Sequence, residues 1–235
     1  MAGTSGGSTR WPTSGWPPSD WQGLLRDAIR LIDTLTEAPA WTFGGGTALA
    51  VHYGHRISYD IDIFLASADA LTELSPAKNP ATRALLGAHS YQFPGNYLKL
   101  ELDRGEIDFI VAGRRTDDPS APHDFEGRSI LLETPWESAI KKIFYRSSTF
   151  KIRDVFDVAA VIDRDGAHLA PCISEVADKL DRLLDRIDAL TPVYEERARK
   201  DLNPTEAGRK YMTAEAIARV AAFIREWRSG NAPAG

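Results

Sequence analysis

The sequence predicts an α+β protein in which a mixed β-sheet precedes a C-terminal helical region. Two observations lead to this prediction. Short stretches of alternating apolar residues, two of them forming a hairpin, occupy the first half of the chain. From Thr134 onward, apolar residues instead recur at helical spacing in one segment after another. We therefore divide the chain into a leader (1–18), a sheet-containing core (19–133) and a helical region (134–235).

The overall composition is ordinary for a globular protein. The chain has 235 residues, of which 43% are hydrophobic and 26% charged, with a formal net charge of −5. This charge argues against nucleic-acid binding through overall charge alone, although a local basic patch remains compatible with it. The single cysteine excludes an intrachain disulfide, and the scattered histidines do not suggest a zinc site. We expect neither a membrane span nor a secretory signal, and hence a cytoplasmic protein.

The N-terminal elements follow from composition and capping signals. Residues 1–18 are rich in Gly, Ser, Thr and Pro without periodicity, so we expect a flexible leader. A helix is expected to begin at Ser19, where Gln22 completes a capping box, and to end before Pro39.

The core segments follow from alternation and turn residues. Trp41–Phe43 is predicted as a strand, with a glycine turn and a helix over 47–53 after it. In a strand over 58–65, alternation places Asp60 and Asp62 on the same face. The remaining expectations for the core are a helix near 81–88, a hairpin over 98–111 with Asp108 on its second strand, and a polar loop over 114–126.

The helical region begins with a strong start signal. Thr134 can cap a helix, Pro135 suits its first position, and Glu137 suits the third. The expected helices are 135–146, 151–163, 174–190, 204–211 and 213–228.

Three aspartates suggest metal chemistry. If their strands are neighbours, Asp60, Asp62 and Asp108 converge at one edge of the sheet. Clustered carboxylates repel one another and are tolerated chiefly when hard divalent cations bridge them. Two magnesium ions could then activate an attacking hydroxyl and neutralise a leaving pyrophosphate. The alternative, which involves no metal binding, is an exposed strand end with solvated carboxylates.

The triple glycine upstream could complete such a site. Gly44, Gly45 and Gly46 let backbone N–H groups approach an anion, at the start of a helix whose N-terminus favours negative charge. Thr47 could add a hydroxyl. No Gly-Lys-Ser/Thr follows, so this is not a Walker A loop, and a simple tight turn is the alternative.

These motifs resemble the DNA polymerase β-like nucleotidyltransferase superfamily. The resemblance rests on Gly46-Thr47, twelve intervening residues, then Asp60-Ile61-Asp62 and a later strand aspartate. More narrowly, GGTALAVHYGHRISYDIDIF and AIKKIFYRSSTFKIRDVFDVAAVI resemble the AbiEii/AbiGii toxin family, which includes the MenT-type tRNA-modifying toxins. The resemblance implies a polymerase β-like nucleotidyltransferase domain, completed at its nucleotide site by the C-terminal helical region.

The resemblance also implies residue roles. Gly45, Gly46 and Thr47 would contact the triphosphate, and Asp60, Asp62 and Asp108 would bind metal, with Asp108 helping to deprotonate the acceptor hydroxyl. Lys142, in preference to Lys141, would grip phosphates. Arg153, Asp154 and Asp157 would lie beside the nucleotide. From the residues alone, Lys142 could be a solvated lysine, Arg153 and Asp154 a structural pair, and His55 a capping residue.

The implied function is transfer of a nucleoside monophosphate from an NTP to a hydroxyl. The acceptor implied is a tRNA 3′ end, and the biological role is the toxin of a toxin–antitoxin or phage-defence system, with a separate antitoxin protein. Two alternatives remain open at this stage. One is a nucleotidyltransferase acting on a small molecule or a protein, and the other is a non-catalytic NTP-binding module.

Overall fold

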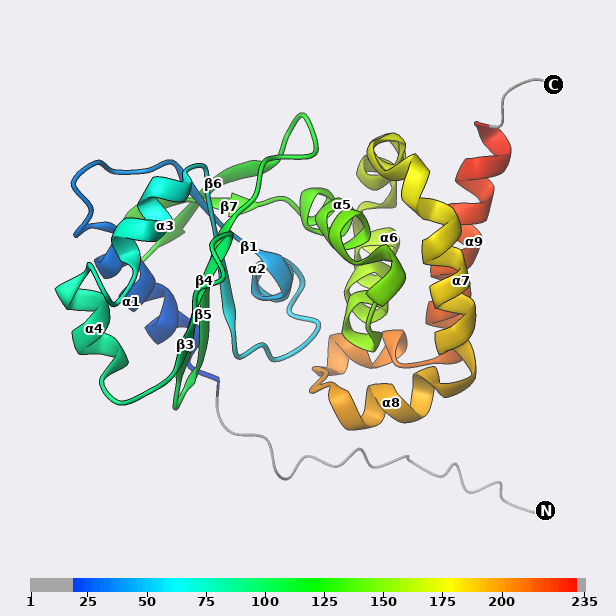
Figure 1. The fold of residues 1–235 in the computed structure, drawn as a ribbon. Helices are drawn as coiled ribbons and strands as arrows, with labels where there is room; N and C mark the ends of the chain where they lie inside the picture. Colours follow the sequence, from blue (N-terminus) through cyan, green and yellow to red (C-terminus); the bar gives the residue numbers. More distant parts are fainter. Residues whose placement is uncertain (1–18, 232–235) are drawn as a thin grey trace, which may run out of the picture.

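A computed structural model describes residues 19–231 and shows a mixed α+β fold (Figure 1). Within these residues, seven strands form one sheet in the order β3-β4-β5-β2-β1-β7-β6. The strands are β1 (Trp41–Gly44), β2 (Ile61–Leu65), β3 (Tyr91–Gln92), β4 (Tyr97–Leu102), β5 (Gly105–Val111), β6 (Ser120–Phe125) and β7 (Arg128–Glu133). The predicted α+β class with a mixed sheet is confirmed.

The centre of the sheet explains why it is mixed. Strand β2 is antiparallel to β1 and parallel to β5, and β1 is parallel to β7. Ile61, Ile63 and Leu65 are buried on one face of β2, so Asp62 and Phe64 lie on the other. The alternation predicted for this strand is therefore present, although the strand begins at Ile61 and Asp60 lies just before it.

Helices cover the two faces of the sheet differently. In Figure 1, α1 (Trp21–Ile32), α3 (Ala68–Leu74) and α4 (Pro80–Leu86) lie on one side of the sheet. On the other side, α2 (Gly45–Tyr53) lies between the sheet and the helical region. Helix α2 connects the two parts, because Ala48 packs into the core under the sheet while Leu49 and Tyr53 pack into the core of the helical region.

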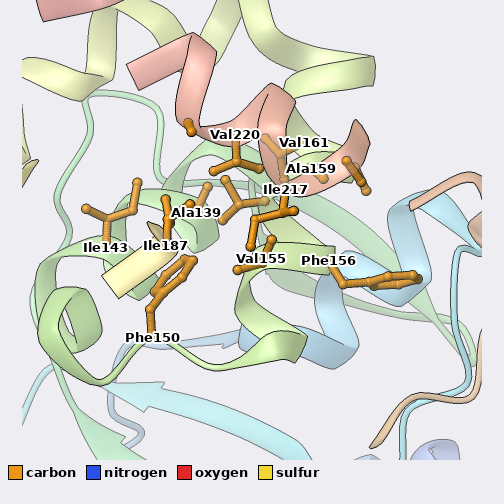
Figure 2. Close-up of a cluster of buried hydrophobic side chains, with 14 of the residues drawn as sticks. Ala139, Ile143, Phe150, Val155, Phe156, Ala159, Val161, Ile187, Ile217 and Val220 are labelled. Atoms are coloured by element: carbon orange, nitrogen blue, oxygen red, sulfur yellow. The ribbon is translucent and has the colours of Figure 1, made fainter. Parts of the chain in front are cut away.

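The helical region contains five α-helices connected by short 3-10 segments, within the described part of the chain. They are α5 (Pro135–Arg146), α6 (Ile152–Cys172), α7 (Leu180–Leu190), α8 (Tyr194–Asp201) and α9 (Ala214–Gly230), and Tyr194 and Ala198 of α8 belong to the same core as the other four (Figure 1). The core between them is entirely apolar at its centre, where Phe150, Val155 and Ile217 meet from different segments (Figure 2). The start of α5 is as predicted, because the Thr134 side chain accepts a hydrogen bond from Glu137 N and Pro135 occupies the first turn.

The predicted loop over 114–126 is wrong in its second half. Residues Ser120–Phe125 form the edge strand β6, which pairs antiparallel with β7. Pro122 lowers the strand signal in the sequence, but an edge strand tolerates proline because one of its sides needs no ladder donor. The neighbour β7 was also missed, although Ile130 and Leu132 alternate as a half-buried strand should.

Several element boundaries also differ from the prediction. The cap of α1 is Asp20, which accepts from Gly23 N, and not Ser19, whose hydroxyl donates to Ser58 O. Helix α2 begins at Gly45, so two of the three glycines belong to the helix. Helices α3 and α8 were not predicted. The first part of the predicted helix 174–190 is a 3-10 segment, and the predicted α-helix 204–211 is also a 3-10 segment, Glu206–Tyr211.

Two predictions concern the ends of the chain and the membrane. The predicted leader 1–18 lies outside the described residues. None of the helices within 19–231 is long and apolar enough to cross a membrane.

Replacing Phe150 with Ala tests the importance of the helical core. Its side chain is fully buried, so Phe150→Ala removes a large apolar group and leaves a cavity. We expect the free energy of unfolding, measured by urea denaturation, to fall by about 3–5 kcal/mol. The control Val193→Ala, at a position that is 41% exposed, should change it by less than about 1 kcal/mol. Equal effects of the two variants would contradict this description of the core.

Candidate functional site

A cavity of about 350 Å³ lies between the sheet and the helical region. The sheet side contributes Gly45, Thr47 and the carboxylate strands, and the helical side contributes residues from Ser138 to Arg153. The predicted site residues that line it are Gly45, Gly46, Thr47, Asp60, Asp62, Asp108, Lys142 and Arg153. The structure thus brings together residues that are up to about a hundred positions apart in the chain.

The glycine turn is shaped by contact with a carboxylate. Gly45 has φ +70°, and a Cβ atom at this position would lie 2.0 Å from Asp62 Oδ2. Only glycine fits there without displacing Asp62. The Gly45 N–H donates to Glu133 Oε2 at 3.0 Å, so this amide is already engaged by the protein. Since α2 begins at Gly45, the next amides, of Gly46 and Thr47, also belong to its first turn, where N–H groups lack intrahelical partners.

Thr47 is tied to the segment that leads into β2. Its hydroxyl donates to the backbone oxygen of Asp60 and lies 2.7 Å from Ser58 Oγ. Thr47 is almost fully buried, yet it lines the cavity. These contacts give Thr47 a role in positioning Asp60, which the sequence did not indicate.

Asp62 and Asp108 form the centre of the site. They are direct partners in the parallel pairing of β2 with β5, so their side chains share one face of the sheet. Asp108 Oδ2 lies 3.2 Å from Lys99 Nζ, while Asp108 Oδ1 is buried and has no hydrogen-bond partner. Burial and the neighbouring charge of Asp62 raise the pKa of Asp108 to about 7.

Asp60 lies just before the first residue of β2 and lines the same cavity as Asp62 and Asp108. Its Oδ1 accepts a hydrogen bond from Glu106 N at 3.3 Å, and its Oδ2 lies 3.9 Å from Arg153. Burial, together with the charge of Glu106, raises the pKa of Asp60 above its ordinary value. The three predicted metal ligands line one cavity, but nowhere in residues 19–231 are three His, Cys, Asp or Glu side chains gathered closely enough to hold a metal ion.

The donor chemistry nevertheless suits a hard divalent cation. Carboxylate oxygens are the ligands that magnesium prefers, and the site offers them at a cavity wall. Asp108 Oδ1 is a buried acceptor without a partner, and burying such an atom is costly unless something occupies it in the working protein. The residues present therefore fit a divalent cation, with Asp62 and Asp108 as the pair already in register.

On the opposite wall, buried carboxylates hold Lys142. Its ammonium lies 3.0 Å from Asp154 Oδ1 and 3.1 Å from Asp157 Oδ2. Asp154 and Asp157 are fully buried and do not line the cavity. The sequence placed them beside a nucleotide, whereas the structure places them behind Lys142, where they orient its side chain.

Asp157 is also the partner of two residues that follow α2. Arg56 Nε donates to its Oδ1 at 2.8 Å, and His55 Nε2 lies 2.9 Å from the same oxygen. Burial alone would raise the pKa of Asp157, but Arg56 and Lys142 outweigh it and hold that pKa well below the ordinary range. The same balance, with Lys142 and Arg146 as the cations, lowers the pKa of Asp154.

Two further charged residues belong to the site: Glu133, which was not singled out from the sequence, and Lys141, which was named only as the less favoured alternative to Lys142. Glu133 is fully buried and accepts from Lys141 Nζ at 2.7 Å, as well as from the Gly45 amide. Lys141 Nζ also lies 3.8 Å from the centre of the Phe64 ring. Burial raises the pKa of Glu133 in spite of Lys141. The only available signal was the position of Glu133, at the end of an alternating stretch and next to a helix cap.

The sequence matches one protein family over most of its length. The family described as "Nucleotidyl transferase AbiEii toxin, Type IV TA system" matches residues 29–225. The chain belongs to this family. It is therefore a nucleotidyltransferase of the toxin–antitoxin type, which uses an NTP and has an antitoxin as its partner. No curated protein matches the chain.

Two solved structures are similar to this one at low identity. MenT4, the nucleotidyltransferase toxin Rv2826c from Mycobacterium tuberculosis H37Rv, is 14% identical with a TM-score of 0.47, over 90% of this chain and 89% of that one. JHP933 from Helicobacter pylori is 13% identical with a TM-score of 0.46, over 90% and 94% of the two chains. At these TM-scores, the likeness carries no conclusion about substrates or residue roles.

Replacing Asp157 with Asn tests the buried charge cluster. The variant leaves Arg56 and Lys142 without their full counter-charge, so we expect a loss of about 3–5 kcal/mol in the free energy of unfolding at neutral pH. The pKa of Asp157 in the folded protein lies well below its ordinary value of 3.8. The ionised carboxylate therefore contributes fully to the free energy of unfolding above pH 3.8, and this contribution is lost as the pH falls from there through the folded pKa. The difference between wild type and variant should therefore shrink as urea denaturation is repeated at decreasing pH.

The matched control for this variant is Asp188→Asn. Asp188 is 62% exposed and pairs with Arg225 at the surface, so its replacement should cost less than about 1 kcal/mol at any pH. A difference between wild type and Asp157→Asn that does not change between about pH 7 and pH 3 would refute the charge-cluster explanation.

Proposed function

We propose that this nucleotidyltransferase moves a nucleoside monophosphate from an NTP to a hydroxyl at the 3′ end of an RNA, with tRNA as the acceptor. The single observation that supports this most is the register pairing of Asp62 with Asp108 at a cavity that Lys142 faces from the helical side. Carboxylates on one wall and cations on the other suit a metal-bound triphosphate.

The metal ions of the proposed reaction are two magnesium ions. Asp60, Asp62 and Asp108 would hold them, since all three line the cavity and Asp108 Oδ1 is free to accept a ligand contact. Bound magnesium would supply charge neutralisation on the phosphates and acidify the attacking hydroxyl. Asp108 lines the cavity with one oxygen free of protein partners, so it is placed to help deprotonate an acceptor hydroxyl.

The protein's own groups would bind and orient the triphosphate. The first turn of α2, with the amides of Gly46 and Thr47, offers a helix N-terminus to an anion. Lys142 would bind phosphate oxygens while Asp154 and Asp157 keep its side chain in place. Arg153, which is 43% exposed and already near Asp60, can reach either the triphosphate or the acceptor.

The acceptor proposal rests on the charges at the helical rim of the cavity. Arg146, Lys151 and Arg153 lie there together, on a chain with a net charge of −5. Tyr145 lines the same rim and is 52% exposed, so its ring could stack on a base. Cations with an exposed aromatic ring suit an unpaired RNA end. We also propose that the protein acts in the cytoplasm and that residues 134–235 complete the nucleotide site of residues 19–133.

A labelling experiment tests this function. The purified protein is incubated with magnesium, one α-labelled NTP at a time, and total tRNA. We expect label in the tRNA for the wild type, and a rate lower by on the order of 100-fold or more for Asp62→Asn or after chelation of magnesium. The control Asp69→Asn, an exposed carboxylate at the start of α3, should retain the wild-type rate.

The outcomes of this experiment separate the alternatives. Label in a small molecule or in protein, with none in tRNA, would refute the RNA acceptor and leave a nucleotidyltransferase with another substrate. Unchanged labelling by Asp62→Asn would refute the proposed metal site. NTP binding without any release of pyrophosphate would favour a non-catalytic module.

A further inference from the structure

A lysine lies in line with the carboxylates of the site. Lys99 on β4 is the direct register partner of Asp108 on β5, and Asp108 is the direct partner of Asp62 on β2. Because partners across neighbouring strands point to the same face, the three side chains form one row across the sheet. We call this set, Lys99, Asp108 and Asp62, the charged row.

The contacts of Lys99 are divided between two carboxylates. Its ammonium donates to Glu106 Oε2 and lies 3.2 Å from Asp108 Oδ2. The side chain is 22% exposed and lines the cavity, whereas the side chain of Glu106 is 37% exposed. Lys99 therefore has a second partner nearby if its contact with Asp108 is lost.

Lys99 neutralises only part of the charged row. It contacts Asp108 through Oδ2, while Asp108 Oδ1 remains buried without a partner. Asp62 faces Asp108 in register and brings a second negative charge to the same place. A single ammonium is thus set against two facing carboxylates, and a divalent cation would match their charge better.

We propose that Lys99 is the counter-ion of the carboxylates in the metal-free protein and that it competes with the divalent cation for Asp108. In the metal-free state it reduces the repulsion between Asp62 and Asp108. When the cation binds, the ammonium leaves Asp108 and stays in the cavity on Glu106. Lys99 is therefore a positioning residue that sets the affinity for metal. The inference rests on the metal site of the proposed function.

This role has a consequence for the order of binding. Lys99 lies where a cation would bind and neutralises part of the negative charge that would attract it. The protein without NTP should therefore bind metal weakly. An NTP brings both its own metal and phosphate oxygens, which can accept the displaced ammonium. Metal and NTP should therefore bind together more favourably than either does alone, and Lys99 should increase this coupling.

Manganese binding in the absence of NTP tests the proposal directly. Free Mn²⁺ is followed by electron paramagnetic resonance during titration of wild type, Lys99→Met and Lys99→Arg. Lys99→Met keeps the apolar stem and removes the charge, so we expect about tenfold tighter binding. Lys99→Arg keeps the charge and should bind as weakly as the wild type. The control Lys78→Met, at an exposed lysine between α3 and α4, should bind like the wild type.

The direction of the change separates this role from a structural one. Damage to the fold would weaken metal binding, whereas the proposal requires that it tighten. The melting temperature of each variant, with and without Mn²⁺, shows whether it is folded, and Lys99→Gln replaces Lys99→Met if the latter is not. Binding that is unchanged or weaker in the folded, uncharged variant would overturn the proposal.

Carboxylate variants show which hypothesis has failed if the result is negative. If Asp62→Asn abolishes Mn²⁺ binding but Lys99→Met does not tighten it, the metal site stands and the role of Lys99 is wrong. If Asp62→Asn and Asp60→Asn bind Mn²⁺ like the wild type, the proposed metal site itself is wrong, and the inference about Lys99 is overturned with it.

Discussion

The geometry of the cavity depends on the buried carboxylate of Asp157. This one group contacts His55 and Arg56, which follow α2, and Lys142 on α5. A carboxylate buried without such partners would be too costly to keep ionised, so the cluster forms as a whole or not at all. Since its partners come from the sheet-containing part and from the helical region, Asp157 holds together the two walls between which the cavity lies.

A second buried carboxylate connects the sheet-containing part to the helical region near the glycine turn. Glu133, the last residue of β7, connects the Gly45 amide to Lys141 on α5. The two sets of contacts are alike, because each pairs a fully buried carboxylate with a lysine of α5. Helix α5 thereby places adjacent lysines in different surroundings, Lys142 against Asp154 and Asp157, and Lys141 against Glu133 and the ring of Phe64.

Local signals explain what the sequence could predict. Capping at Thr134 and alternation in the hairpin around Asp108 are properties of neighbouring residues, and both are present in the structure. Strand β6 was missed because its pairing with β7 compensates for the proline within it. The shared face of Asp60 and Asp62 followed from alternation, but the pairing of Asp62 with Asp108 depends on which strands are neighbours. The contacts of Glu133 and Lys99 are likewise tertiary, so residue type alone did not reveal them.

The pairing of the cavity's cations has a consequence for how binding responds to salt. Lys99, Lys141 and Lys142 each already contact a carboxylate of the protein. When such a lysine turns to a phosphate of a polyanion, its carboxylate partner is left without a cation, so the pair neutralises less phosphate charge and displaces fewer of the counterions condensed on the polyanion. Arg146 and Arg153 at the edge of the cavity also lie near carboxylates. The slope of affinity against salt concentration would therefore follow the net positive charge of the cavity and would understate the number of cations that the bound molecule finally contacts.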